Sequence, residues 1–141
     1  MPRIADTTPY NGALERTQRL GLNPLFDELQ AILTGFRLEV KEEKDANGAA
    51  FVREMLDESF VRCGGWTKGR SGEIDWSKSK TVNGTRVTLG VEIQVSARSD
   101  LLVMDIVHLR DAIVAGSVDV GVIVVPSVRL SVFLTDRTPS M

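Results

Sequence analysis

Three polar side chains at fixed spacing are the residues of this sequence best suited to chemistry: Asp75, Glu92 and Gln94. Glu92 and Gln94 belong to the segment 86–95, in which most alternate residues are apolar. A buried carboxylate without a partner is costly, so an acid in such a segment requires a compensating cation or hydrogen bond. Two carboxylates that leave room for water molecules are ligands that suit Mg²⁺. The residue types therefore indicate a magnesium site.

The predicted strands decide whether these groups can meet. We expect strands at 73–77 and 86–95, and strand alternation places Glu92 and Gln94 on one face. If the strands pair, Asp75 and Glu92 converge, and Mg²⁺ held there could activate water and neutralise charge on a scissile phosphate. Gln94 could orient the water or a phosphate oxygen, but an amide cannot act as a general base. The alternative is two solvated acids on a wet sheet face, which spacing alone favours.

A family resemblance favours the metal site over the solvated acids. The runs Gly72-Glu73-Ile74-Asp75-Trp76 and Gly90-Val91-Glu92-Ile93-Gln94 resemble the PD-(D/E)XK nuclease superfamily. More narrowly, they resemble type II restriction endonucleases of the BglII/BstYI kind, in which Gln replaces the usual Lys, as Gln94 does here. The resemblance extends from about Leu22 to the C-terminus, and it includes Asp105 and the segments 116–126 and 134–139.

The resemblance implies Mg²⁺-dependent cleavage of double-stranded DNA, with Mn²⁺ able to substitute. Asp75 and Glu92 would hold the metal, together with the main-chain carbonyl of Ile93, and Gln94 would position water or phosphate. Glu58 is the candidate for a helix acid near the metal, although a solvated helix face is the commoner role for such a residue. A homodimer is expected by analogy, because a two-fold dimer reads a palindrome.

The apolar periodicity and the turn residues predict an α/β (α+β) fold with a mixed sheet. The resemblance implies that this fold is a restriction-endonuclease-like core in which helices flank the sheet. Residues 1–20 are polar and are expected to form a flexible N-terminal arm, and 21–141 a single domain. The third helix is expected to turn Leu102, Ile106, Leu109 and Ile113 inward, and 118–125 should be a central strand. The predicted elements are helix 23–35, strand 36–40, turn 45–48, helix 49–62, strands 73–77 and 86–95, helix 100–115, and strands 118–125 and 128–134.

The net charge of −2 gives no overall basic footprint, so DNA contact would require a local patch. Basic and polar residues near the proposed site could form one, and a solvated hairpin tip is the alternative. These candidates for DNA binding are Lys78, Lys80, Arg86, Ser96 and Arg98.

Composition limits the other classes. One cysteine, Cys63, and one histidine, His108, exclude a Cys/His zinc site and a disulfide within the chain. We find no signal peptide or membrane-spanning segment, so a cytoplasmic location is expected. The restriction enzymes continue beyond the position of Met141, and their DNA-binding surfaces are basic. These two departures favour an alternative, which is a non-catalytic DNA- or protein-binding module on a shortened nuclease fold.

Overall fold

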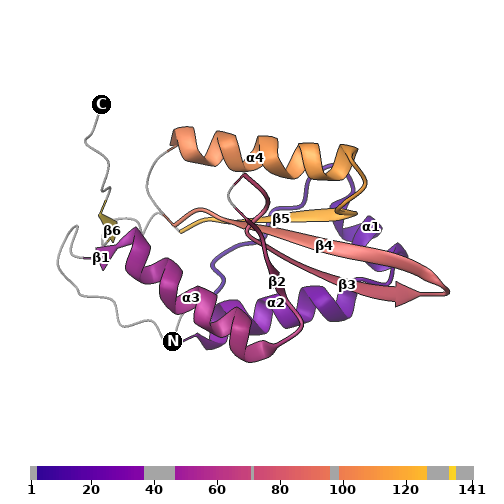
Figure 1. Cartoon of the computed structure of the whole chain (residues 1–141), viewed down its shortest axis with the longest axis horizontal. Coiled ribbons are helices and arrows are strands. Elements are labelled where there is room, and N and C mark those ends of the chain that lie inside the picture. Colours follow the sequence, from indigo (N-terminus) through magenta and orange to yellow (C-terminus); the bar gives the residue numbers. More distant parts are fainter. Residues whose placement is uncertain (1–2, 37–46, 71, 96–98, 127–133, 136–141) are drawn as a thin grey trace.

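The protein has a central β-sheet with helices on both faces (Figure 1). The computed structural model describes residues 3–36, 47–70, 72–95, 99–126 and 134–135. Helix α4 lies on one face of the sheet, and helices α2 and α3 lie on the other (Figure 1). The elements are α1 (Ala13–Arg19), α2 (Asn23–Gly35), β1 (Asn47–Gly48), α3 (Ala49–Cys63), β2 (Thr67–Lys68), β3 (Trp76–Val82), β4 (Thr85–Ile93), α4 (Ser99–Val114), β5 (Val120–Val124) and β6 (Leu134–Thr135).

The main sheet has four strands in the order β2-β3-β4-β5. Strand β4 runs antiparallel to β3 and parallel to β5, so the sheet is mixed, as the sequence predicts. The hairpin of β3 and β4 turns at Asn83 and Gly84, whose φ angles of 50° and 80° match a two-residue turn of type I′. This turn fixes the register in which Trp76 faces Val91.

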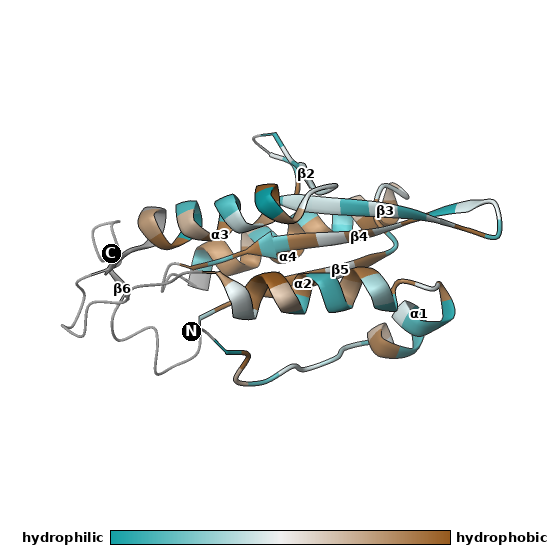
Figure 2. Cartoon of the chain, turned by 90° about the horizontal axis from the view of Figure 1, so that it is seen from below, coloured by the Kyte–Doolittle hydropathy of each residue, from teal (hydrophilic) through white to brown (hydrophobic). Residues whose placement is uncertain are grey.

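Strand β3 differs from the prediction in both bounds. Residues 73–75 precede the strand, and residues 78–82, which lie between the two predicted strands, continue it to Val82. The polar side chains of β3, drawn in white and teal in Figure 2, are mostly half-buried or exposed. Pairing with β4 rather than apolar burial therefore makes this segment a strand.

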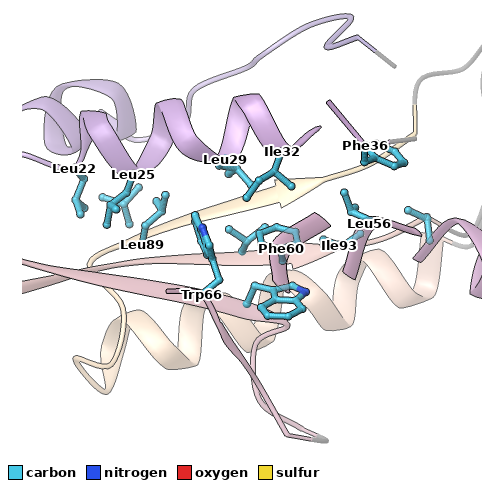
Figure 3. Packing of buried hydrophobic residues seen from close by; sticks show 14 of the residues in the cluster. Leu22, Leu25, Leu29, Ile32, Phe36, Leu56, Phe60, Trp66, Leu89 and Ile93 are labelled. Atoms are coloured by element: carbon cyan, nitrogen blue, oxygen red, sulfur yellow. The ribbon is translucent and has the colours of Figure 1, made fainter. Parts of the chain in front are cut away.

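The apolar core lies between the sheet and helices α2 and α3 (Figure 3). Alternate residues of β4, including Leu89, Val91 and Ile93, are fully buried there. Leu29 of α2 and Phe60 of α3 cover them, and Phe60 also stacks on Trp76 with ring centroids 4.8 Å apart. Each such side chain contributes roughly 1.5–3 kcal/mol by leaving water. Burial of this face of β4 therefore contributes several kcal/mol, on the order of the per-residue value times three, to the free energy of folding.

The predicted N-terminal arm contains a helix that the sequence analysis missed. Helix α1 begins after Gly12, whose φ of 69° is accessible to glycine at little cost. Thr17 is buried, and the Nε of Arg16 donates to the main-chain oxygen of Asp119 at 2.9 Å. These contacts stabilise a short helix that polar composition alone could not predict.

Helix α4 packs with a different face from the one predicted. Leu109 is buried as expected, but Ile106 and Ile113 are 49% and 41% exposed. Asp105 and His108 are half-buried and contact residues of the segment that follows the hairpin turn. The correction matters, because the sheet-facing side of α4 is partly polar.

The C-terminal prediction needs a similar correction. Among the residues described, β5 pairs only with β4 and lies at the sheet edge, not at its centre. The predicted strand 36–40 and most of the predicted strand 128–134 lie outside the described residues. The short strands β1 and β6 pair with each other in parallel.

Candidate active site

The candidate site lies at the open end of the β3–β4 hairpin. Because β3 begins at Trp76, opposite Val91, the edge of β4 that faces β3 has no strand partner beyond that point in the part of the chain that the structure describes. Asp75 takes the place of the missing partner, and its Oδ2 accepts a hydrogen bond from the Ile93 nitrogen at 2.7 Å. In return, Glu92 Oε1 accepts from the Asp75 nitrogen at 2.9 Å. The structure therefore brings the two predicted acids together.

Strand β2 fixes the main chain at Asp75. The Gly69 nitrogen donates to the Asp75 carbonyl oxygen at 2.8 Å. A Cβ on Gly69 would lie 1.7 Å from the main-chain oxygen of Ile74, so no larger residue fits without a backbone shift. The close approach of these two segments holds Asp75 against the end of β4.

Arg53 of α3 completes this side of the site. Its Nη2 forms an ion pair with Asp75 Oδ1, and its Nη1 donates to the Ile93 carbonyl oxygen at 3.2 Å. One guanidinium thus contacts two of the three groups predicted to bind a metal. The sequence analysis missed Arg53, and its only signal was a cation directly after Val52, a buried residue of the inner face of α3.

Glu92 is the most deeply buried acid of the site, with 1% of its surface exposed. Burial raises its pKa to about 8, and a hydrogen bond with Asp105 and the charges of Asp75 and Asp105 act in the same direction. The raised pKa favours the protonated form of Glu92 at neutral pH, in which its carboxyl group donates the hydrogen bond to Asp105. A nearby cation would favour the charged form instead.

Burial also raises the pKa of Asp75, and the charge of Asp105 adds to the effect. The hydrogen bond from Ile93 and the positive charge of Arg53 oppose it. Clustered acids with raised pKa values in a partly buried position are typical of functional sites, because a bound cation would stabilise their charged forms.

A second group of ligand-type atoms lies on the α4 side of Glu92. The Gln94 Nε2 donates to Asp105 Oδ2 at 3.1 Å, and His108 Nδ1 lies 4.0 Å from Glu92 Oε2. Ligand atoms of Glu92, Asp105 and His108 all lie within 4.8 Å of one another. The sequence analysis noted Asp105 only through the family resemblance and named His108 only in excluding a Cys/His zinc site. Their three-residue spacing on one helical face was the available signal.

The two groups of possible metal ligands differ in the atoms that they offer. Asp75, Glu92 and the Ile93 carbonyl offer only hard oxygen atoms, which suit Mg²⁺, and a guanidinium already shows that a cation is accommodated there. The other group includes an imidazole, which better suits transition metals. The residues present therefore fit Mg²⁺ at the Asp75 position.

The remaining predicted site residues are placed elsewhere. Glu58 is exposed on α3, and no contact described for it reaches Asp75 or Glu92. Lys78 forms an ion pair with Glu28 of α2 and also donates to the Gly64 carbonyl, so its charge is already compensated.

Two of the basic candidates lie far along the hairpin. Lys80 and Arg86 are exposed and pair in register with Val87 and Thr81, toward the turn. At about 3.3 Å per residue, Arg86 lies roughly 20 Å along β4 from Glu92. Ser96 and Arg98 lie outside the described residues.

A mixed sheet with acids converging at the end of a central hairpin is the arrangement expected for a PD-(D/E)XK-type nuclease. The chain belongs to the BglII/BglIII restriction endonuclease family, because the family model described as "Restriction endonuclease BglII/BglIII" matches residues 6–139. Membership of this family supports a DNA endonuclease function. The match begins ahead of α1, within the segment predicted to be an arm.

No curated protein matches the chain. Among the described residues, none of the helices has the length and apolar character needed to cross a membrane.

Proposed function

We propose that this protein is a Mg²⁺-dependent endonuclease that hydrolyses phosphodiester bonds of double-stranded DNA. The observation that carries the proposal is the reciprocal bonding of the two acids at the open end of the hairpin, where each carboxylate accepts a hydrogen bond from a main-chain nitrogen of the other's segment. The raised pKa of both acids supports it, since each is held in a position that favours a nearby cation.

The residues have distinct roles in this proposal. Asp75 and Glu92 hold the metal with the Ile93 carbonyl, and the hydrogen bonds between their segments keep the donors in place. Bound Mg²⁺ would lower the pKa of a water molecule and neutralise charge on the phosphate. Gln94 positions water or a phosphate oxygen, and Asp105 fixes the orientation of its amide by accepting from Nε2.

The proposed contacts with DNA come from basic and polar residues outside the metal site. Lys80 and Arg86 present exposed charge along the hairpin and would contact phosphates away from the cleavage position. Ser96 and Arg98 directly follow the site in sequence and remain predicted DNA contacts. We further propose a homodimer, with one site for each strand, a single domain over 21–141, a cytoplasmic location, and Mn²⁺ as a substitute metal.

Cleavage of plasmid DNA in Mg²⁺ or Mn²⁺ tests the proposal. The wild-type protein should nick or cut the plasmid, and Asp75→Ala and Glu92→Ala should abolish cutting. Glu73→Ala is the matched control, because Glu73 is an exposed acid two residues from Asp75, and it should retain activity. If folded wild-type protein binds DNA without cutting it in either metal, the non-catalytic module replaces the enzyme.

A further inference from the structure

Arg53 uses the same oxygen atoms that the metal is proposed to use. Its two Nη atoms contact Asp75 Oδ1 and the Ile93 carbonyl oxygen. A planar guanidinium with several N–H donors satisfies both oxygens at once. Mg²⁺ would require these oxygens at about 2.1 Å, and two cations so close together would repel each other. Arg53 and the metal cannot therefore hold the two groups at the same time.

The surroundings of Arg53 allow it to leave without disturbing the core. Its side chain is 38% exposed and borders an open groove along α3. Glu54 and Glu58 line the same groove, together with the cations Arg62 and Lys68, and offer carboxylates to the displaced guanidinium. The proposed metal donors would stay in place, because Asp75 Oδ2 is bonded to the Ile93 nitrogen independently of Arg53.

We propose that Arg53 competes with the divalent cation for Asp75 and Ile93, is displaced when the cation binds, and then contacts the phosphate that is cleaved. The inference rests on the proposed role of Asp75 and Glu92. A guanidinium can donate two parallel hydrogen bonds to phosphate oxygens, and Arg53 remains tethered beside the site after displacement. One residue would then serve the site both before and after the metal arrives.

Calorimetric titration of Mn²⁺ into the DNA-free protein tests the competition. Arg53→Gln should bind Mn²⁺ about tenfold tighter than wild type, which corresponds to the loss of one charge-assisted contact. Arg53→Lys keeps the charge but has a single nitrogen in place of the two Nη atoms that contact Asp75 and Ile93, and it should give an intermediate affinity. Arg62→Gln removes a charge from the same helix and groove and should leave the affinity unchanged. Unchanged or weaker binding by a folded Arg53→Gln protein overturns the competition.

Cleavage at saturating Mg²⁺ tests the phosphate contact. Although Arg53→Gln binds metal more tightly, its kcat should fall by about 10- to 100-fold, and Arg53→Lys should recover part of the loss. A wild-type kcat in Arg53→Gln overturns the phosphate contact. If the wild-type protein binds Mn²⁺ and cuts DNA while the affinity of Arg53→Gln is unchanged, this inference fails and the proposed function stands. If neither protein binds Mn²⁺, both fail.

Discussion

The two faces of strand β4 have opposite characters within a few residues. Toward α2 and α3, Leu89, Val91 and Ile93 are completely buried in apolar surroundings. On the intervening positions, Glu92 and Gln94 are nearly as buried, but their partners include Asp105 of α4. Strand alternation alone separates the residues that stabilise the fold from those suited to chemistry.

The difference shows where the protein gives up stability. Burial of an apolar side chain favours folding, whereas burial of Glu92 among other carboxylates opposes ionisation and raises its pKa to about 8. The apolar face of the strand offsets this cost and keeps the acids in position. Substitutions on the two faces should therefore affect different measurements.

The largest expected effect is a loss of DNA cleavage caused by a substitution among the acids of the proposed metal site. Asp75→Asn removes a proposed ligand charge with little change in shape, and cleavage should fall by about 1,000-fold or more because the metal is held poorly. The melting temperature should change by only a few degrees. Steady-state cleavage assays and thermal melts of the same preparation measure both, and a folded variant that keeps wild-type cleavage would contradict the assignment of Asp75.

On the apolar face, the effect should fall on stability instead. Leu89→Ala leaves a cavity beneath α2, and it should lower the free energy of unfolding by about 2–5 kcal/mol. Cleavage by the folded fraction should remain near the wild-type rate. Urea denaturation gives the first quantity. A stable Leu89→Ala protein with lost cleavage would mean that the two faces are not separable.

The third effect is a dependence of stability on pH. Folded protein holds the proton of Glu92 up to about pH 8, whereas the unfolded chain releases it near the ordinary pKa of 4.5. The folded state then binds more protons between these values, so stability falls as pH rises from about 4.5 to 8. The loss should be on the order of a few kcal/mol.

Urea unfolding in EDTA at several pH values measures this dependence. Glu92→Gln, which cannot ionise, should remove most of the fall, and the remainder belongs to Asp75, whose raised pKa acts in the same direction. A wild-type protein equally stable at pH 6 and pH 9 would show that Glu92 is not protonated in the fold.

A smaller effect should come from α4. Asp105→Asn removes a hydrogen-bond partner and a charge that both raise the pKa of Glu92, so the fall in stability should shift to lower pH. Asp111→Asn on the exposed side of the same helix is the control and should not move it. Equal shifts in the two variants would indicate a general effect of net charge and not contact with Glu92.

The smallest effect concerns the hairpin. Arg86→Ala should weaken DNA binding modestly and reduce the slope of log affinity against log salt by about one, as expected for one phosphate contact. Lys78→Ala should leave the slope unchanged and lower stability instead, because Lys78 is paired with Glu28. Fluorescence anisotropy in Ca²⁺ at several salt concentrations distinguishes the two outcomes.

Much of the fold follows from local sequence signals. Apolar periodicity gave α2 and α3 nearly to their bounds, and strand alternation gave β4 to within two residues at each end. The face of α4 could not be predicted, because apolar residues lie on all sides of that helix. Strand β3 was misjudged since its polar residues are stabilised by pairing with β4, which local composition does not reveal.

The site was predictable only in part. The acids Asp75 and Glu92 stood out because they interrupt or adjoin an apolar segment, and their meeting followed from pairing of the two strands. Arg53 gave no comparable signal, since a cation on a helix is ordinary and its contact with Asp75 depends on how α3 crosses the end of the hairpin. The predicted basic residues were chosen because they are close to the acids in sequence. Lys80 and Arg86 are nevertheless far from Glu92 in space, because the hairpin is long and they lie near its turn.

The most direct test of the central claim is to locate a metal ion. Anomalous diffraction from crystals soaked in Mn²⁺ would show its position without relying on activity. The proposed function predicts a peak between the carboxylates of Asp75 and Glu92 and the Ile93 carbonyl. The competition proposed for Arg53 adds that its guanidinium has moved away from that position. A peak instead among Glu92, Asp105 and His108, with Arg53 still on Asp75, would contradict the proposed function.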